Sequence, residues 1–167
     1  MQAASSIHVF ATNAKVRRVL ILGGYGGFGA RLSRRLARAG WQVIIAGRNL
    51  DSAERLARVL PNAVAVKADR NSDLRALLDA HRPQLLIDAA GPFQGSGYQV
   101  AKACLKAGIA YLDLADARDF VSGSLVLDAR ARAVGVTVIL GASSVPALSG
   151  AVVRHLVAGL DRVEGLD

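Results

Sequence analysis

The chain has few cysteines, histidines and aromatic residues. Its 167 residues include one cysteine, three histidines and 5% aromatic residues. A single cysteine excludes an internal disulfide framework, and the histidines lie too far apart in sequence to indicate a metal site. Cys104 falls on the predicted inner face of a helix, where buried packing is favoured over a catalytic thiol. The sequence therefore predicts neither a disulfide nor a metal centre.

Long apolar runs are also lacking, although 52% of the residues are hydrophobic. No stretch approaches the roughly 18 consecutive apolar residues of a membrane span. Residues 1–17 lack the uninterrupted apolar centre of a secretory signal, and we expect them to form a poorly ordered leader. The expected protein is cytoplasmic and has no membrane partner.

Acidic residues are outnumbered by basic ones, with 13 Asp and Glu against 21 Lys and Arg and a formal net charge of +8. Such a charge can attract an anionic ligand or nucleic acid. The basic residues are spread over the outer sides of several predicted helices, without the interleaved aromatic residues of a single-strand-binding surface. We interpret them as solvated helix faces and expect no nucleic-acid partner.

What the chain does contain is a glycine-rich segment placed between two regular patterns. Residues 19–22 are apolar and typical of a strand buried on both faces, and Gly24 to Gly29 then read G-x-G-x-x-G. The following residues have helical periodicity, with arginines on one side. The apolar side, which we expect to face the core, consists of Phe28, Leu32, Leu36 and Ala39. A strand, a glycine turn and a helix in this order predict a phosphate-binding site, and a purely structural turn is the alternative.

Each glycine of the motif has a separate expected role. Gly24 would permit the tight turn, Gly26 would let backbone N–H groups approach a pyrophosphate, and Gly29 would let the helix pack closely on the strand. The pyrophosphate would then lie at the positive end of the helix.

Arg48 follows the second predicted strand, residues 41–46. At this position NAD sites carry an acidic residue that binds the ribose hydroxyls, whereas NADP sites use an arginine for the 2′-phosphate. A guanidinium can pair with that phosphate and stack on adenine. The sequence therefore predicts NADP(H) over NAD(H), with a solvated loop arginine as the alternative. Just beyond, Asp51 is expected to cap the helix of residues 52–60, with Glu54 completing a capping box.

Two further strand ends supply candidate ligand contacts. Asp69, after the third predicted strand, could contact an adenine edge, although helix capping explains it equally well. The fourth strand, residues 85–88, leads into a loop that we expect to approach the ribose and nicotinamide half of a dinucleotide. The small and rigid residues of that loop suit a close approach. The candidates are Ala90, Gly91, Pro92 and Phe93.

Six predicted strands alternate with helices along residues 18–160. The last two strands are residues 109–114 and 136–140, separated by a helix of residues 121–133, and a final helix begins at Pro146. Parallel strands need helical crossovers, which are right-handed, so the pattern predicts an α/β, doubly wound parallel six-stranded sheet of order 3-2-1-4-5-6. Asp113 and Asp116 fall at the ligand-facing edge, where capping or solvation is favoured over acid–base chemistry.

Taken together, these segments resemble the N-terminal NADP-binding (Rossmann) domain of saccharopine dehydrogenase-like oxidoreductases. The segments that carry the resemblance are residues 23–32, Gly47-Arg48, residues 89–93 with the helix to residue 107, and residues 111–116. The resemblance implies that the first cradles the pyrophosphate, the second binds the 2′-phosphate and the third flanks the ribose and nicotinamide. The pyrophosphate residues would be Gly24, Tyr25, Gly26, Gly27, Phe28 and Gly29. Ala115-Asp116 departs from the Gly-Glu that the family often has there.

The resemblance implies the cofactor domain of an NADP-dependent oxidoreductase, which positions the nicotinamide for hydride transfer to or from a small substrate. Residues 161–167 would begin a further domain that supplies most of the substrate pocket. No nucleophile with its base is visible, so we name no catalytic residue and expect this stretch alone to be inactive. A non-catalytic dinucleotide-sensing or scaffolding module is the second hypothesis. An exposed sheet edge or domain-contact surface could also produce a homodimer.

Overall fold

Short runs of apolar and β-branched residues form six parallel strands in one sheet. The computed structural model describes residues 17–162 and 164, and its sheet order is β3-β2-β1-β4-β5-β6. The strands are β1 (Arg18–Leu22), β2 (Gln42–Gly47), β3 (Ala63–Lys67), β4 (Leu85–Asp88), β5 (Ala110–Asp113) and β6 (Val138–Ile139). The predicted doubly wound fold and strand order are confirmed. Apart from Arg17, the predicted leader lies outside the described residues, as do residues 163 and 165–167.

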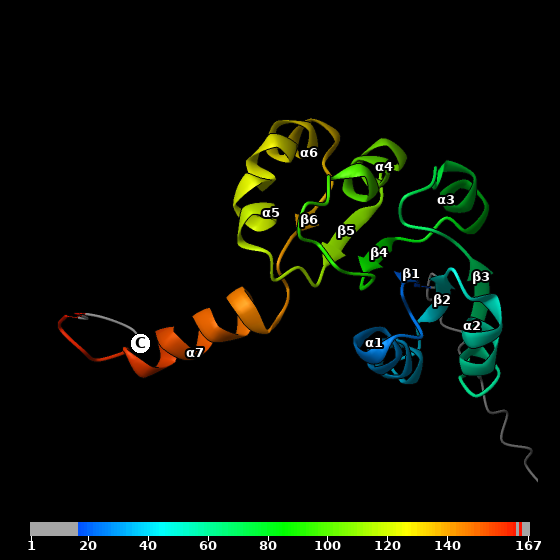
Figure 1. The fold of residues 1–167 in the computed structure, drawn as a ribbon, viewed down its shortest axis with the longest axis horizontal. Coiled ribbons are helices and arrows are strands. Elements are labelled where there is room, and N and C mark those ends of the chain that lie inside the picture. The colour runs from blue at the N-terminus through cyan, green and yellow to red at the C-terminus, as the bar shows by residue number, and fades with distance from the viewer. Residues whose placement is uncertain (1–16, 163, 165–167) are drawn as a thin grey trace, which may run out of the picture.

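Helices cover both faces of the sheet (Figure 1). They are α1 (Gly27–Arg38), α2 (Leu50–Ala57), α3 (Arg75–His81), α4 (Gln99–Ala107), α5 (Arg118–Ser122), the 3-10 helix η1 (Gly123–Leu127), α6 (Asp128–Val134), the π-helical turn η2 (Ser144–Leu148) and α7 (Ser149–Leu156). Val19 and Ile21 pack with α1 and α2, whereas Leu20 and Leu22 pack with α3 and α4. This alternation explains why a central strand is apolar at every position.

The predicted inner face of α1 is only partly correct. Leu32 and Leu36 pack against the core, but Phe28 is 72% exposed and Ala39 is also exposed. The buried residues of α1 are Gly29, Ser33 and Ala37. Small residues on this face let the helix lie close to the sheet, and the Ser33 hydroxyl donates to the Gly24 carbonyl at 2.8 Å.

Two other helices differ from expectation at their starts. Asn49, not Asp51, caps α2: its Oδ1 accepts a hydrogen bond from Ser52 N–H at 2.9 Å, and the helix begins at Leu50. The helix expected over residues 121–133 is divided into α5, η1 and α6. Gly123 lies at the first break, and the change of helix type lets Leu127 reach the core.

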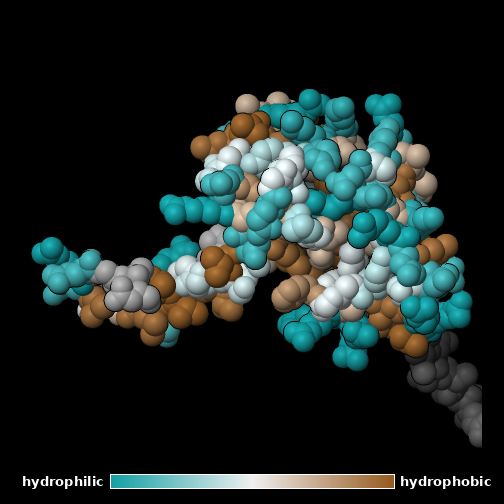
Figure 2. All heavy atoms as spheres, viewed as in Figure 1, coloured by the Kyte–Doolittle hydropathy of each residue, from teal (hydrophilic) through white to brown (hydrophobic). Residues whose placement is uncertain are grey.

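The last helix extends away from the sheet (Figure 1). Figure 2 shows hydrophobic residues gathered on this segment, and Leu148, Val152, Leu156 and Leu160 are all exposed there. None of the described helices is long and apolar enough to cross a membrane.

Candidate functional site

Three loops meet at the carboxyl edge of the central strands, because β2, β1 and β4 are parallel neighbours. They are the glycine loop (residues 23–29), the arginine loop (residues 47–49) and the β4 loop (residues 89–98). Gly23 N–H donates to the Ala46 carbonyl at 2.8 Å, and Ala89 N–H donates to the Leu22 carbonyl at 2.9 Å. The sheet therefore brings together the three segments that the sequence indicates as a dinucleotide site.

The glycine that permits the tight turn of the first loop is not the one expected from the sequence. The left-handed backbone of the turn falls at Gly23, with a φ of 70°, and not at Gly24. Gly24 permits close packing instead, since a Cβ there would lie 2.9 Å from the Ile21 carbonyl oxygen. Gly29 lets α1 approach the turn as predicted, because a Cβ there would lie 2.8 Å from the carbonyl carbon of Gly23.

The N-terminus of α1 has a chemistry suited to an anion. Its N-cap is Gly26, which has no side chain to accept a backbone hydrogen bond, and its first turn contains no acidic residue. The first N–H groups of an α-helix have no acceptor within the helix and carry a partial positive charge. At Gly27 a Cβ would meet no described atom within 4 Å, so this side of the turn is open.

The arginine loop borders a cavity of about 580 Å³. The lining residues are Tyr25, Arg48, Asn49, Leu50, Asp51 and Lys67. Two cations against one carboxylate make this lining net positive. Lys67 was not identified from the sequence, although the register of β2 with β3 places it opposite Gly47. That register could have indicated it, because the carboxyl ends of paired parallel strands share one edge.

Tyr25 joins the glycine loop to the arginine loop. Its hydroxyl oxygen accepts a hydrogen bond from Asn49 N–H at 2.9 Å, and its ring packs where a Cβ on Gly47 would otherwise lie.

Asp69 has a local role in its turn: its Oδ1 accepts from Asn71 N–H at 3.0 Å and its carbonyl accepts from Ser72 N–H at 3.1 Å. Asp69 is not among the residues that line the cavity, and its contact with an adenine stays a prediction.

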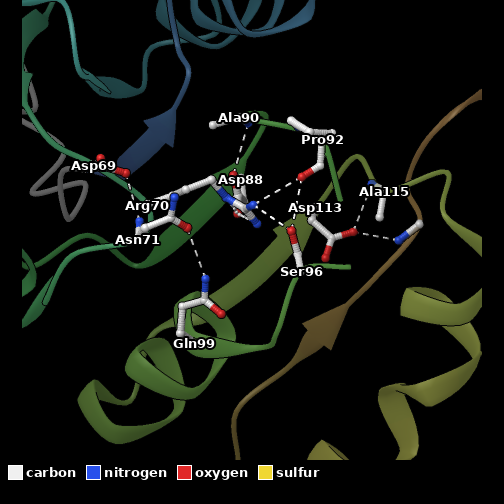
Figure 3. A network of polar contacts seen from close by, with 11 residues as sticks. Asp69, Arg70, Asn71, Asp88, Ala90, Pro92, Ser96, Gln99, Asp113 and Ala115 are labelled. Carbon is white, nitrogen blue, oxygen red and sulfur yellow. Dashed lines mark hydrogen bonds and ion pairs between the residues drawn. The ribbon is translucent and has the colours of Figure 1, made fainter. Parts of the chain in front are cut away.

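The β4 loop is held from within the molecule (Figure 3). Asp88 is fully buried at the end of β4 and forms an ion pair with Arg70, with Nη2 3.0 Å from Oδ2. Burial raises the pKa of Asp88, while the charge of Arg70 opposes that shift. The loop exposes Gly91 and Pro92 and leaves Ala90 partly buried. Phe93 is buried, so its ring anchors the loop.

Phe93 belongs to a small aromatic cluster that links the β4 loop to the segment after β5. The ring centroids of Phe93 and Phe120 lie 5.3 Å apart, and those of Phe120 and Tyr98 lie 4.9 Å apart. The Tyr98 hydroxyl donates to the Phe120 carbonyl at 2.7 Å. Sequence reasoning did not find this cluster, because its members come from two segments that are distant in the sequence, the β4 loop and α5.

Asp113 is a second fully buried carboxylate, at the end of β5 beside Asp88. Its Oδ1 accepts hydrogen bonds from Ala115 N–H at 3.1 Å and Gly141 N–H at 2.8 Å. Burial raises the pKa of Asp113 against the lowering effect of these two amides. Asp113 therefore fixes two loops and does not cap a helix, because the N-cap of α5 is Ala117. Asp116 is exposed, as the solvation alternative expects.

Within residues 17–162 and 164, no three His, Cys, Asp or Glu side chains are placed to hold a metal ion. Cys104 is fully buried as predicted, and burial raises the pKa of its thiol to about 12. A thiol in such surroundings stays protonated at neutral pH.

Comparison with known proteins identifies the family. Residues 19–139 match the model of the saccharopine dehydrogenase NADP-binding domain, which covers more than half of the chain. The predicted family and its nicotinamide dinucleotide cofactor are confirmed by this match. No curated protein matches the chain significantly.

Solved structures of low sequence identity share the fold. An oxidoreductase of the short-chain dehydrogenase/reductase family from Burkholderia thailandensis is 18% identical over 85% of this chain and 75% of its own, with a TM-score of 0.63. A 3-hydroxyacyl-CoA dehydrogenase type-2 from Mycobacterium avium is 18% identical over 74% of this chain and 71% of its own, with a TM-score of 0.62. The Bordetella bronchiseptica enzyme WbmG in complex with NAD is 20% identical over 62% of this chain, with a TM-score of 0.50. The present chain spans 38% of the length of WbmG.

Proposed function

Because the chain belongs to the family of saccharopine dehydrogenase NADP-binding domains, we propose that it holds NADP(H) across the carboxyl edge of its sheet for hydride transfer. The pyrophosphate would bind at the N-terminus of α1, and the 2′-phosphate would bind in the cavity beside Arg48 and Lys67. The nicotinamide half would lie along Ala90 to Phe93 of the β4 loop. The observation that carries this proposal is the direct bond between the glycine and arginine loops, from Asn49 to Tyr25.

The residues present fit each part of this ligand. The open side of the turn at Gly27 leaves room for a group to reach the backbone amides. Arg48 and Lys67 offer two cations to a dianionic phosphate, and Arg48 can donate two hydrogen bonds to it in a planar fork. Asp51, on the same cavity, would disfavour a phosphate, so the preference depends on both cations.

The protein's part in the reaction would be binding and orientation. A bound nicotinamide supplies the hydride chemistry, and the β4 loop would hold the ring at a fixed place above the sheet edge. We infer that the substrate is a small molecule held largely by another domain, because the two buried carboxylates at this edge are used to fix loops.

Calorimetric titration of the chain with NADPH and NADH tests this function. We expect tighter binding of NADPH, and we expect Arg48→Ser and Lys67→Ser each to weaken NADPH binding about tenfold or more while leaving NADH binding almost unchanged. The matched control is Arg34→Ser, which removes an exposed cation from the solvent face of α1. Equal affinities for the two dinucleotides would overturn the choice of NADP, and binding of neither would overturn the function.

A further inference from the structure

Arg70 connects two parts of the edge that are distant in the sheet. It follows β3, yet its side chain crosses to the β4 loop (Figure 3). Nε and Nη2 donate to Asp88 Oδ2 at 3.2 Å and 3.0 Å, and Nη1 donates to Ser96 Oγ at 3.1 Å and to the Pro92 carbonyl at 3.4 Å. The guanidinium carbon also lies 4.9 Å from the ring centroid of Phe93.

The Arg70 side chain is buried against Asp88 and the β4 loop and has little contact with solvent. Its side chain is 11% exposed and that of Asp88 is 0% exposed. A buried charge is tolerated only when it is paired and its hydrogen-bonding groups are satisfied. Removing the guanidinium would leave Asp88 as an unpaired charge, so the two residues act as one unit.

Contacts of this unit hold the β4 loop at both ends. Asp88 Oδ1 accepts from Ala90 N–H at 3.1 Å, at the start of the loop. Ser96 accepts from Arg70 and donates its own hydroxyl to the Pro92 carbonyl at 3.1 Å. With Phe93 packed inward, these bonds leave Gly91 and Pro92 exposed at the start of the loop.

The loop held in this way borders the glycine turn. A Cβ on Gly23 would lie 3.0 Å from the Ala89 carbonyl oxygen, so the first residues of the β4 loop lie close against the backbone of the turn. Arg70 itself comes three residues after Lys67, which lines the cavity on the other side of the edge. Its side chain nevertheless turns away from that cavity, since all its hydrogen bonds are to Asp88 and the β4 loop.

We propose that Arg70 is a positioning residue, which through Asp88 and Ser96 holds the β4 loop in the conformation that receives the nicotinamide half of the dinucleotide. This proposal rests on the proposed function. Arg70 acts on the ligand through the loop and makes no contact with the adenosine half.

Two ligands separate this role from general stabilisation of the fold. NADPH contains both halves of the dinucleotide, whereas 2′,5′-ADP contains only the adenosine half with its 2′-phosphate. Arg70→Lys keeps the positive charge beside Asp88 but loses the planar fork that reaches Ser96 and Pro92. We expect this change to weaken NADPH binding about tenfold and to leave 2′,5′-ADP binding within about twofold, as measured by calorimetry.

A control variant and a second variant separate a positioning role of Arg70 from a general effect of losing an arginine. Arg58→Lys alters another arginine of a carboxylate pair, with Glu54, but on the exposed surface of α2, and both ligands should bind it normally. Ser96→Ala leaves the buried ion pair intact and should weaken NADPH binding about threefold without affecting 2′,5′-ADP. Equal losses for both ligands, or unchanged NADPH binding in both variants, would overturn the positioning role. If the unmodified chain binds neither ligand, the proposed function fails and this role with it.

Discussion

The Tyr25 hydroxyl accepts a hydrogen bond from the backbone N–H of Asn49, and this bond joins the loop after β1 to the loop after β2. Asn49 in turn caps α2 through its own side chain. The glycine turn, the start of α2 and the loop that carries Arg48 are therefore connected through two side chains. The position of the Arg48 backbone depends on a residue of the glycine motif.

Tyr25→Phe should loosen this connection while keeping the packed ring. The change removes one acceptor from a backbone N–H, which costs about 1 kcal/mol for a typical hydrogen bond. We expect a loss of stability of that size in urea unfolding, together with weaker NADPH binding of up to about fivefold.

The affinity for NADH provides the internal comparison for this variant. If the bond positions Arg48 for a 2′-phosphate, NADPH binding should fall more than NADH binding. Equal falls for both dinucleotides would show that Tyr25 supports only the shared pyrophosphate site. An unchanged affinity for both would contradict a role for the hydroxyl in either.

The parts of the fold that were predictable are those with a local signal. The apolar run of β1, the glycines that follow it and the helical period after them are contiguous, so strand, turn and helix could be inferred without long-range information. Strand order followed from the rule for helical crossovers. Arg48 could be named as a candidate because the role proposed for it depends on its place at one strand end.

What could not be predicted depends on the directions of side chains across loops. The pairing of Arg70 with Asp88 spans 18 positions, with α3 between them, and no periodic pattern marks it. Phe28 has the spacing of a core residue but is exposed, because the small residues Gly29 and Ser33 take the inner face. A pattern of apolar residues cannot indicate that a glycine or a serine is buried, so it predicts the wrong inner face for the start of α1.

Gly29→Ala should separate α1 from the glycine turn. A Cβ at this position would collide with the Gly23 carbonyl group, which belongs to backbone held by hydrogen bonds to β2. Overpacking of this kind costs about 1 to 3 kcal/mol of unfolding free energy, and the shifted helix should lose most of its NADPH affinity. Urea unfolding and calorimetric titration would measure the two effects.

Gly27→Ala is the matched control for that variant, two residues away in the same helix. A Cβ there meets no described atom within 4 Å, and alanine favours helix more than glycine does. Its stability should equal or slightly exceed that of the unmodified chain. Equal destabilisation by both changes would show that loss of glycine flexibility, and not the contact with Gly23, is responsible.

Asp113 offers a test of electrostatics at the same edge. The pKa of this carboxyl is raised by burial, and within the described residues its Oδ2 has no hydrogen-bond partner. Asp88, Arg70 and Tyr111 are the titratable or charged groups that influence it. A raised pKa means that the folded state binds the proton more tightly than the unfolded state does, so protonation stabilises the fold.

Asp113→Asn should therefore change the pH dependence of stability in a defined direction. The protonated Asp113 contributes fully to the unfolding free energy below the ordinary pKa of 3.8, which applies to the unfolded chain. This contribution is lost as pH rises through the raised pKa of the folded state. Asparagine can keep one oxygen as acceptor for Ala115 and Gly141 without ionising. Between about pH 4 and about pH 7, the unmodified chain should lose unfolding free energy relative to this variant in urea titrations. Asp113→Ala, which removes the acceptor itself, should be destabilised at both pH values by about 2 kcal/mol or more. Parallel pH profiles for the unmodified chain and Asp113→Asn would show that burial does not raise this pKa.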